Sequence, residues 1–388
     1  MAKKVRAITP FVNRRALSRR EREERYRRWL YIGAGVVLAL VVALAAAGLY
    51  QSLVVAPASP VATVNGVPIR TDTYQRWVQY RRYDLRTSLA RIRNQLAQLD
   101  PNNADQQTLY AMLSQQQQQL QSEAMSLTMT TLDELIDAEL IRQEAARRGL
   151  TVTPEEVSTE IEHLFGYNLP QPTPVPTPIT ATAPITETPT PTEQPMTEQQ
   201  FKQYYTEYIA ELRKNAGFRE ADFRRLLETS LLRDKLQQAM AAEVPTTAEQ
   251  VHARHILVDK EEEARAALER IRKGEDFAAV AKEVSTDTGT KDNGGDLGWF
   301  PRGMMVEEFE AAAFALQPGQ VSDVVQTSYG YHIIKVEERD PNRPLDQYVL
   351  LDRQSRALDD WLSAQRQSEA VKRYWSLDKV PKDKSAGS

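Results

Sequence analysis

The stretch His252-Ala-Arg-His-Ile-Leu-Val258 decides how the second half of this chain of 388 residues folds. It ends in a continuous apolar run, which predicts a buried β-strand. The segments that follow it are two helices (261–273 and 277–284), a glycine-containing loop, a third helix (306–314) and two strands (321–325 and 331–337). Strands and helices that do not alternate regularly predict an α+β unit, which we place at residues 251–338.

Three further motifs stand in this unit: Gly294-Gly-Asp-Leu-Gly-Trp-Phe300, Phe309-Glu-Ala-Ala-Ala-Phe314 and Gly330-Tyr-His-Ile-Ile-Lys-Val336. Together with His255-Ile-Leu-Val258, they resemble the parvulin (PpiC or rotamase) family of peptidyl-prolyl cis–trans isomerases over about 90 residues. The resemblance implies a four-stranded, mainly antiparallel sheet surrounded by helices. It also implies rotation about X–Pro amides, whose uncatalysed barrier is ~18–20 kcal/mol.

Such a rotation breaks no bond, so the site needs an apolar cup beside a few fixed polar groups and no nucleophile. By the resemblance, Leu297, Met305 and Phe309 form the cup for the proline ring, although their pattern alone is equally that of core residues. His255 and His332 resemble paired imidazoles on neighbouring central strands. A purely structural link between those strands remains the alternative for this pair.

Asp287 falls where some parvulins have Cys and many bacterial ones have Asp, which argues against covalent catalysis. Its carboxylate would tune the neighbouring imidazole or repel a carbonyl oxygen as the amide twists, or else only cap a loop. The acidic run 259–263 stands where phosphate-directed parvulins have a basic loop, so specificity for phosphorylated residues is not expected. Tyr329 stands where some relatives have a small hydroxyl residue, and Val306 stands where some have Gln.

The N-terminus predicts a membrane anchor. A basic tail (1–28) precedes the charge-free run from Trp29 to Tyr50, and the next charge is Arg70. A helix of this length spans roughly 33 Å, enough for a bilayer core. The positive-inside rule predicts a single transmembrane helix at 29–51, a cytoplasmic N-terminus and extracytoplasmic domains at the cell membrane. A cleaved signal peptide ending near Ala45-Ala-Ala47 is the alternative.

Residues 57–250 predict a mostly helical domain that opens with a hairpin. Asn65-Gly66 lies between two short apolar runs, which is a tight-turn signal. With the helices that follow, this segment resembles the chaperone part of SurA-, PrsA- and PpiD-type foldases. A Pro/Thr-rich insertion (169–196) interrupts it and is expected to be extended and solvated. A C-terminal helix within 344–378 is expected to pack on this helical domain.

Composition excludes several classes of function. The chain has no cysteine, so disulfides, thiolate metal sites and a Cys nucleophile are excluded. The formal net charge of −4 carries no signature of nucleic-acid binding. No metal-ligand spacing and no Ser/His/Asp set of a protease is evident, so neither metal nor cofactor is expected.

The leading hypothesis is therefore a foldase that combines an isomerase with a chaperone and acts on unfolded or nascent secreted polypeptides containing X–Pro bonds. One alternative is a chaperone or peptide-binding protein whose parvulin-like domain grips Pro segments with little or no catalysis. Another is a structural protein of the cell envelope, with the Pro/Thr-rich insertion as a spacer. Both a monomer and a homo-oligomer are compatible with the sequence.

Overall fold

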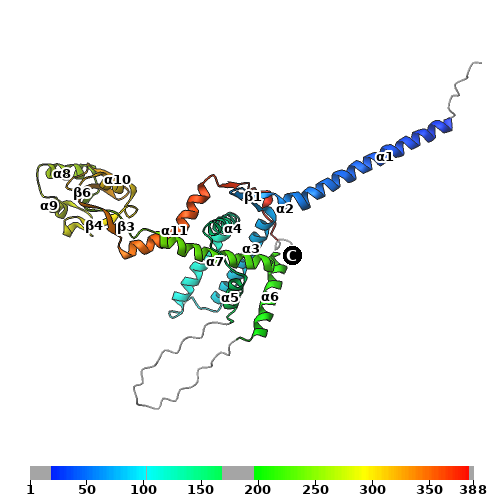
Figure 1. The fold of residues 1–388 in the computed structure, drawn as a ribbon, viewed down its shortest axis with the longest axis horizontal. Coiled ribbons are helices and arrows are strands. Elements are labelled where there is room, and N and C mark those ends of the chain that lie inside the picture. Colours follow the sequence, from blue (N-terminus) through cyan, green and yellow to red (C-terminus); the bar gives the residue numbers. More distant parts are fainter. Residues whose placement is uncertain (1–18, 102, 168–195, 384–388) are drawn as a thin grey trace, which may run out of the picture. The chain divides into compact units, whose positions relative to one another are not determined.

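A computed structural model describes residues 19–101, 103–167 and 196–383 (Figure 1). The chain forms two compact units. The first unit is Met1–Leu140, Ser158–Leu227 and Arg366–Ser388, and the second unit is Ile141–Val157 and Glu228–Gln365. The predicted Pro/Thr-rich insertion lies outside the described residues except for its last residue, and so do residues 1–18 of the predicted basic tail.

The elements follow one another through both units. They are α1 (Arg19–Tyr50), the π-helical turn η1 (Gln51–Val55), α2 (Ala56–Ala58), β1 (Pro60–Val64), β2 (Val67–Arg70), α3 (Thr71–Leu96), α4 (Gln107–Arg147), α5 (Pro154–Leu164), α6 (Glu198–Ala216), α7 (Glu220–Glu243), β3 (Thr247–Val258), α8 (Glu261–Arg272), α9 (Phe277–Val284), η2 (Lys291–Asn293), β4 (Asp296–Pro301), α10 (Glu307–Ala315), β5 (Val325–Thr327), β6 (Gly330–Pro344), α11 (Gln347–Gln367), β7 (Val371–Arg373) and η3 (Leu377–Lys379). This mixed composition confirms the predicted α+β class with a largely helical N-terminal part.

Helix α1 contains the apolar run, and the helical stretch Tyr26–Ala58 is long and apolar enough to cross a membrane by length and composition. Beyond residue 51, where the predicted span ends, the chain continues helically through η1 and α2 as far as Ala58. Residues 51–58 contain no glycine, and Pro57 stands in the first turn of α2, where a missing N–H costs nothing.

The predicted N-terminal hairpin is present in the first unit. Strands β1 and β2 pair antiparallel, and Val64 faces Val67 across the turn. Asn65 and Gly66 have φ of 49° and 81°, the left-handed conformation that a two-residue turn of this kind needs. Strand β7, from the end of the chain, pairs with the other edge of β1 to complete a three-stranded sheet.

Aromatic side chains pack the core of the first unit beside this sheet. Phe218 is fully buried; its ring stacks on Tyr80 at a centroid distance of 4.3 Å and meets Trp77 edge-on at 5.6 Å. The fully buried Tyr74 accepts a hydrogen bond from the indole of Trp375 at 2.9 Å. These contacts bring α3, the loop before α7 and the C-terminal segment into one core.

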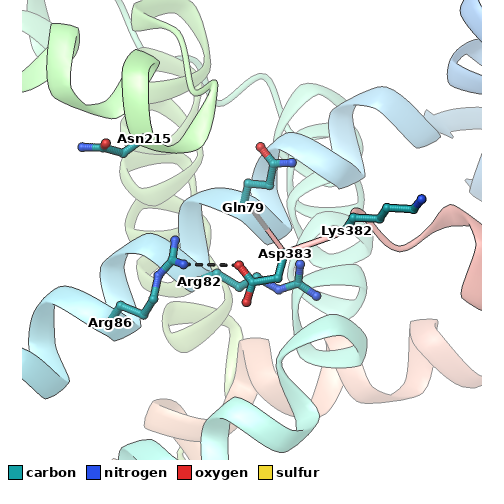
Figure 2. Close-up of a pocket in the computed structure, with 6 residues that line it drawn as sticks. All are labelled: Gln79, Arg82, Arg86, Asn215, Lys382 and Asp383. Carbon is teal, nitrogen blue, oxygen red and sulfur yellow. Dashed lines mark hydrogen bonds and ion pairs between the residues drawn. The ribbon is translucent and has the colours of Figure 1, made fainter. Parts of the chain in front are cut away.

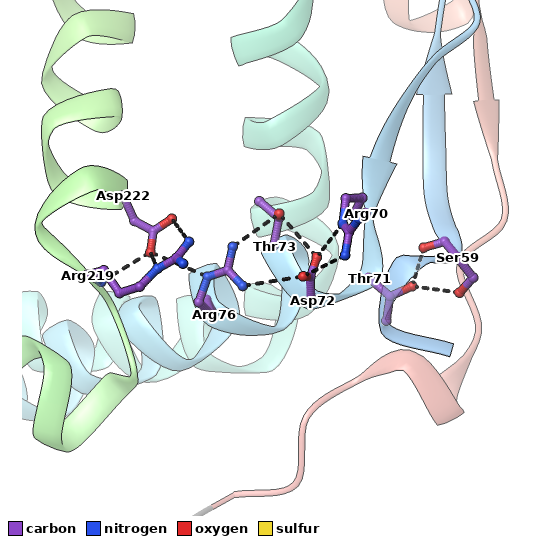
Figure 3. Close-up of polar contacts among 8 residues, drawn as sticks. All are labelled: Ser59, Arg70, Thr71, Asp72, Thr73, Arg76, Arg219 and Asp222. Atoms are coloured by element: carbon purple, nitrogen blue, oxygen red, sulfur yellow. Dashed lines mark hydrogen bonds and ion pairs between the residues drawn. The ribbon is translucent and has the colours of Figure 1, made fainter. Parts of the chain in front are cut away.

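A polar network runs along α3 to the start of α7 (Figure 3). The Asp222 carboxylate is almost fully buried; it accepts a hydrogen bond from Arg219 Nε at 2.9 Å and forms an ion pair with Arg76 at 3.4 Å. Arg76 also pairs with Asp72 at 3.7 Å. Because two guanidinium groups compensate it, the buried carboxylate is tolerated.

Arg70 is the N-cap residue of α3, and its side chain accepts no capping hydrogen bond. The Thr71 hydroxyl donates to the carbonyl oxygen of Ser59 at 2.8 Å (Figure 3). The hydroxyl therefore ties the helix to the segment before β1.

The sheet of the second unit has the order β4-β3-β6-β5, with every neighbouring pair antiparallel. This confirms the four-stranded antiparallel sheet. Its long central pair sets His255 opposite Ile334 and Leu257 opposite His332. His255 and His332 are thus diagonal neighbours on one face. The strand expected at 321–325 begins only at Val325, while Val321 makes an isolated bridge to Lys335.

Each face of this sheet carries its own core. Helices α8 and α9 cover one face, where Ile256, Val258 and Ile333 are buried. Helix α10 packs on the other face, against Phe300 and Ile334. Both imidazoles belong to the α10 face, because side chains alternate along a strand and His255 and His332 share that parity with Ala253 and Ile334.

Helix α11 packs within the second unit against the C-terminal part of α7. Leu358 and Leu362 are buried, and Gln237 donates to the carbonyl oxygen of Gln354 at 2.6 Å. The helix ends at Gln367, well before the end of the segment 344–378, and the chain continues into β7.

Gly295 positions the strand that carries His255. Its backbone has φ of +75°, and a Cβ there would lie 2.0 Å from the carbonyl oxygen of His255. Gly298 has a similar φ of +70° but open space around it. We predict that Gly298→Ala costs only the strain of a positive φ, about 1 kcal/mol, whereas Gly295→Ala costs several times more because backbone must move.

Urea denaturation of the two purified variants, with hydrogen exchange read at the β3 amides, measures this difference. Equal stability and equal β3 protection in the two variants would show that the close approach at Gly295 does not hold the strand.

Candidate active site

A cavity of about 270 Å³ opens on the α10 side of the second unit's sheet. The residues that line it are His255, Leu297, Met304, Met305, Val306, Phe309, Tyr329 and His332. The structure thus brings together all three predicted cup residues and both predicted histidines. The cup comes from β4, the loop before α10 and α10 itself, and the imidazoles from the central strands.

A second hollow, in the first unit, is not a comparable site (Figure 2). At about 10 Å³ it has room for roughly one water molecule. Its arginines already have partners within the C-terminal segment: Arg86 pairs with Asp383 at 3.3 Å, and Arg82 donates to the carbonyl oxygen of Pro381 at 2.7 Å. This hollow is therefore part of how the C-terminal segment docks on α3.

The two imidazoles form the polar floor of the large cavity. Their Nδ1 atoms lie 3.3 Å apart, and the rings are nearly parallel at a centroid distance of 5.5 Å. Phe309 meets both rings edge-on, at 5.8 Å from His255 and 5.3 Å from His332. Since all three side chains are at least 94% buried, their orientation is set by packing.

Asp287 lies next to this pair, as the sequence predicted for a group that acts on an imidazole. Its Oδ2 contacts His255 Nε2 at 2.8 Å and accepts a hydrogen bond from the Thr290 hydroxyl, while its Oδ1 accepts from the backbone N–H of Gly289 at 3.0 Å. Burial works to raise the pKa of the Asp287 carboxyl, but the hydrogen bonds from Thr290 and His255 outweigh it, and the pKa lies below its ordinary value. The carboxylate is therefore ionised at neutral pH.

This charge orients a chain of hydrogen bonds. An ionised carboxylate only accepts, so His255 Nε2 donates to Asp287. The Nδ1 atoms of His255 and His332 share a hydrogen bond at 3.3 Å, and His332 Nε2 contacts the Thr327 hydroxyl at 2.9 Å. The four groups thus form one chain of hydrogen bonds from Thr327 to Asp287, with every imidazole nitrogen engaged.

Burial also keeps His332 neutral. Desolvation lowers the pKa of its imidazole to about 4, and the neighbouring His255 adds to the effect. A neutral imidazole has one donor and one acceptor nitrogen, which matches a place between Thr327 and His255 in the chain of hydrogen bonds.

Two members of this site were missed by the sequence analysis, namely Thr290 and Thr327. Thr290 stands three residues after Asp287 in a loop, a spacing typical of a local hydrogen bond between an Asp and a hydroxyl. Thr327 is the last residue of β5 and reaches His332 across the hairpin, so its role depends on the pairing register. Among the residues that line the cavity, Met304 is the one that the sequence analysis did not name.

Two family models match separate parts of the chain. Residues 246–338 match the PPIC-type PPIase domain, five residues earlier than the predicted start, and residues 23–172 match the SurA-like N-terminal domain. The cavity and the paired histidines therefore belong to a parvulin-type domain, and the chain combines it with a SurA-like N-terminal domain.

Curated relatives of the chain are foldases named PrsA. The chain is 37% identical over 208 residues to the foldase protein PrsA of Caldanaerobacter subterraneus subsp. tengcongensis, covering 53% of this chain and 55% of the relative. It is 41% identical over 155 residues to that of Geobacillus sp. (strain WCH70), covering 37% and 54%. The chain thus spans about half the length of the curated relatives it matches.

Among solved structures, the solution structure of NmPin, the parvulin of Nitrosopumilus maritimus, is 46% identical and covers 24% of this chain and 98% of its own, with a TM-score of 0.23. The crystal structure of the peptidylprolyl isomerase PrsA from Bacillus cereus is 24% identical and covers 64% and 80%, with a TM-score of 0.35.

The lowered pKa of His332 predicts a pH dependence of folding. In the unfolded chain this histidine binds a proton near pH 6.5, whereas in the folded protein it does so only near pH 4. Stability is therefore lost as pH falls from about 6.5 toward 4, by about 2 kcal/mol at pH 5. Urea denaturation at pH 7 and pH 5 measures this loss for the wild type and for His332→Asn, in which it is absent.

His163→Asn is the matched control, because the side chain of His163 is exposed on α5 and should leave the pH dependence as it is in the wild type. A slope that survives in His332→Asn would show that another group causes it.

Proposed function

We propose that this protein is a membrane-anchored foldase whose parvulin-type domain accelerates cis–trans isomerisation of X–Pro bonds in unfolded polypeptides. The observation that carries the proposal is the apolar cavity whose floor is the His255–His332 pair with Phe309 edge-on to both rings. The PrsA relatives and the family match support the same activity.

The cup would act by binding the proline ring and excluding water from the amide. Leu297, Met305 and Phe309 present apolar surface of the kind that a pyrrolidine ring covers well. A planar amide is more polar than a twisted one, because resonance separates charge between its oxygen and nitrogen. Removing water from the amide therefore disfavours the planar state more than the twisted one and lowers the barrier to rotation.

His255, His332 and Asp287 are the proposed catalytic residues, and their hydrogen bonds argue for a non-covalent role. Each imidazole nitrogen contacts a neighbouring group within 3.3 Å, so none is left for attack on a carbonyl. The chain of hydrogen bonds from Thr327 to Asp287 instead holds both rings in fixed positions beside the substrate amide as it twists. Pre-organised polar groups of this kind stabilise a rotating dipole without rearranging themselves.

The first unit supplies the remaining parts of the proposal. Its SurA-like match supports a chaperone role in holding unfolded chains. The apolar run of α1, which follows the basic tail, is proposed as a single transmembrane anchor with the N-terminus in the cytoplasm and the residues after the anchor outside. The clients are then secreted or envelope proteins that fold on the outer side of the membrane.

Activity is expected to depend on Phe309 more than on other core residues. Phe309 and Phe314 are both buried in the same cluster under α10, but only Phe309 lines the cavity. Each substitution by Ala should destabilise the domain by about 3–5 kcal/mol. At a temperature where both variants remain folded, Phe309→Ala should lose at least tenfold in the rate of exchange of an unphosphorylated Pro peptide, and Phe314→Ala far less.

Exchange spectroscopy by NMR on the purified full-length protein measures these rates. If the wild type binds the peptide but leaves its exchange rate unchanged, the domain is a peptide-binding module rather than an isomerase. Equal turnover in the two variants would place the proline ring elsewhere.

The absence of cysteine makes the proposed topology easy to test. Ser18→Cys marks the basic tail, and Gln119→Cys marks an exposed position of α4 in the first unit. A membrane-impermeant maleimide should label Gln119→Cys on intact cells, and Ser18→Cys only after the membrane is permeabilised. Labelling of both, or of Ser18→Cys alone, on intact cells contradicts the proposed orientation.

A further inference from the structure

The mouth of the cavity exposes two large apolar side chains. Met304 is 52% exposed and Tyr329 is 69% exposed, and both line the cavity. Among the exposed large apolar side chains of the second unit, the only others are Tyr348 and Leu351 of α11. Two of these four residues therefore meet at one opening. Apolar surface that is left in water beside a cavity is typical of a binding site.

The backbone of Tyr329 is fixed relative to the histidine pair. It lies in the tight turn between β5 and β6, where Thr327 pairs with Gly330. Its N–H donates to the Thr327 hydroxyl at 3.1 Å, and the same hydroxyl contacts His332 at 2.9 Å. The turn that presents the tyrosine is thus built into the chain of hydrogen bonds that orients the imidazoles.

Met304, the second exposed residue, is adjacent to a cup residue in the sequence. Met304 immediately precedes Met305, which lines the cavity in the predicted cup. A methionine is long and unbranched, so it adapts its shape to different apolar partners. The pair Met304 and Tyr329 therefore combines one adaptable and one rigid apolar surface at the same opening.

The lining of the cavity has no permanently charged cation that could pair with an acidic side chain. Its eight lining residues include no Lys or Arg. A carboxylate or a phosphate that left water here would find no opposite charge, and such a transfer is costly. An apolar side chain at the same place would instead remove both its own surface and that of the two exposed residues from water.

We propose that Met304 and Tyr329 form an apolar clamp that selects polypeptides in which a large apolar or aromatic residue adjoins the proline. Consecutive Cα atoms are about 3.8 Å apart, so the immediate neighbours of a proline in the cup are the residues that reach the mouth. The inference rests on the proposed function, because it takes the cup as the place of the proline ring. It adds the class of sequence that the site prefers.

The test uses the full-length protein and labelled peptides that differ only in the residue before the proline, or in a second series only in the residue after it. The varied residues are Phe, Leu, Glu and phosphoserine. In at least one series, fluorescence anisotropy should show Phe bound roughly tenfold to a hundredfold more tightly than Glu. The double variant Met304→Ser/Tyr329→Ser should reduce this ratio to less than about threefold, because it removes the clamp.

The double variant Tyr348→Ser/Leu351→Ser is the matched control, since it removes the exposed apolar side chains that lie outside the cavity. It should keep the wild-type ratio. Equal binding of Phe and Glu peptides in both series by the wild type overturns the clamp, and so does an unchanged ratio in Met304→Ser/Tyr329→Ser.

Exchange rates of the same peptides separate the clamp from the proposed function. Selective binding that depends on the clamp, without faster exchange, supports the clamp and overturns the isomerase proposal. Faster exchange with no preference among the peptides supports the isomerase and overturns the clamp. Absence of binding to every peptide overturns both.

Discussion

The register of the β3–β6 pair is the constraint on which the site depends. It sets Leu257 opposite His332 and His255 opposite Ile334, so the two imidazoles become diagonal neighbours on the face that α10 covers. A slip of one residue would turn either imidazole to the other face, into the core under α8 and α9. The register is held by the apolar residues between them, because Ile256 and Ile333 must be buried on that opposite face.

The same placement explains why the site is both apolar and ordered. Phe309 closes over the two rings, and desolvation then lowers the pKa of His332 to about 4 and keeps it neutral. The ionised Asp287 carboxylate accepts from His255, which is hydrogen-bonded to His332, so hydrogen bonding fixes the rings that packing has brought together. Packing and hydrogen bonding thus support each other.

Many of the site residues could be predicted from the sequence. The other features depend on contacts between distant segments or on loop paths, which no local pattern predicts. Both histidines, Leu297 and Phe309 lie in sequence motifs that resemble the parvulin family, so their roles could be expected from that resemblance. Thr327 contributes only through pairing across a hairpin, and Thr290 through the path of a loop. Strand β7 has three residues and pairs with a strand about 300 residues earlier, so no local pattern predicts it. The helix extends beyond residue 51, where the predicted span ends, because no residue there breaks a helix.

Strand β7 lies near the end of the sequence, and this affects the order in which parts of the chain can fold during synthesis. The first unit needs β7, Val371–Arg373, to finish its sheet, whereas the parvulin-type domain, residues 246–338, is complete earlier in the chain. Domains fold as their sequences emerge during synthesis. The domain nearer the C-terminus can therefore reach its native state while the sheet nearer the N-terminus still lacks an edge strand. A ribosome that stalls shortly before residue 371 would leave a finished parvulin-type domain joined to a first unit whose sheet lacks β7.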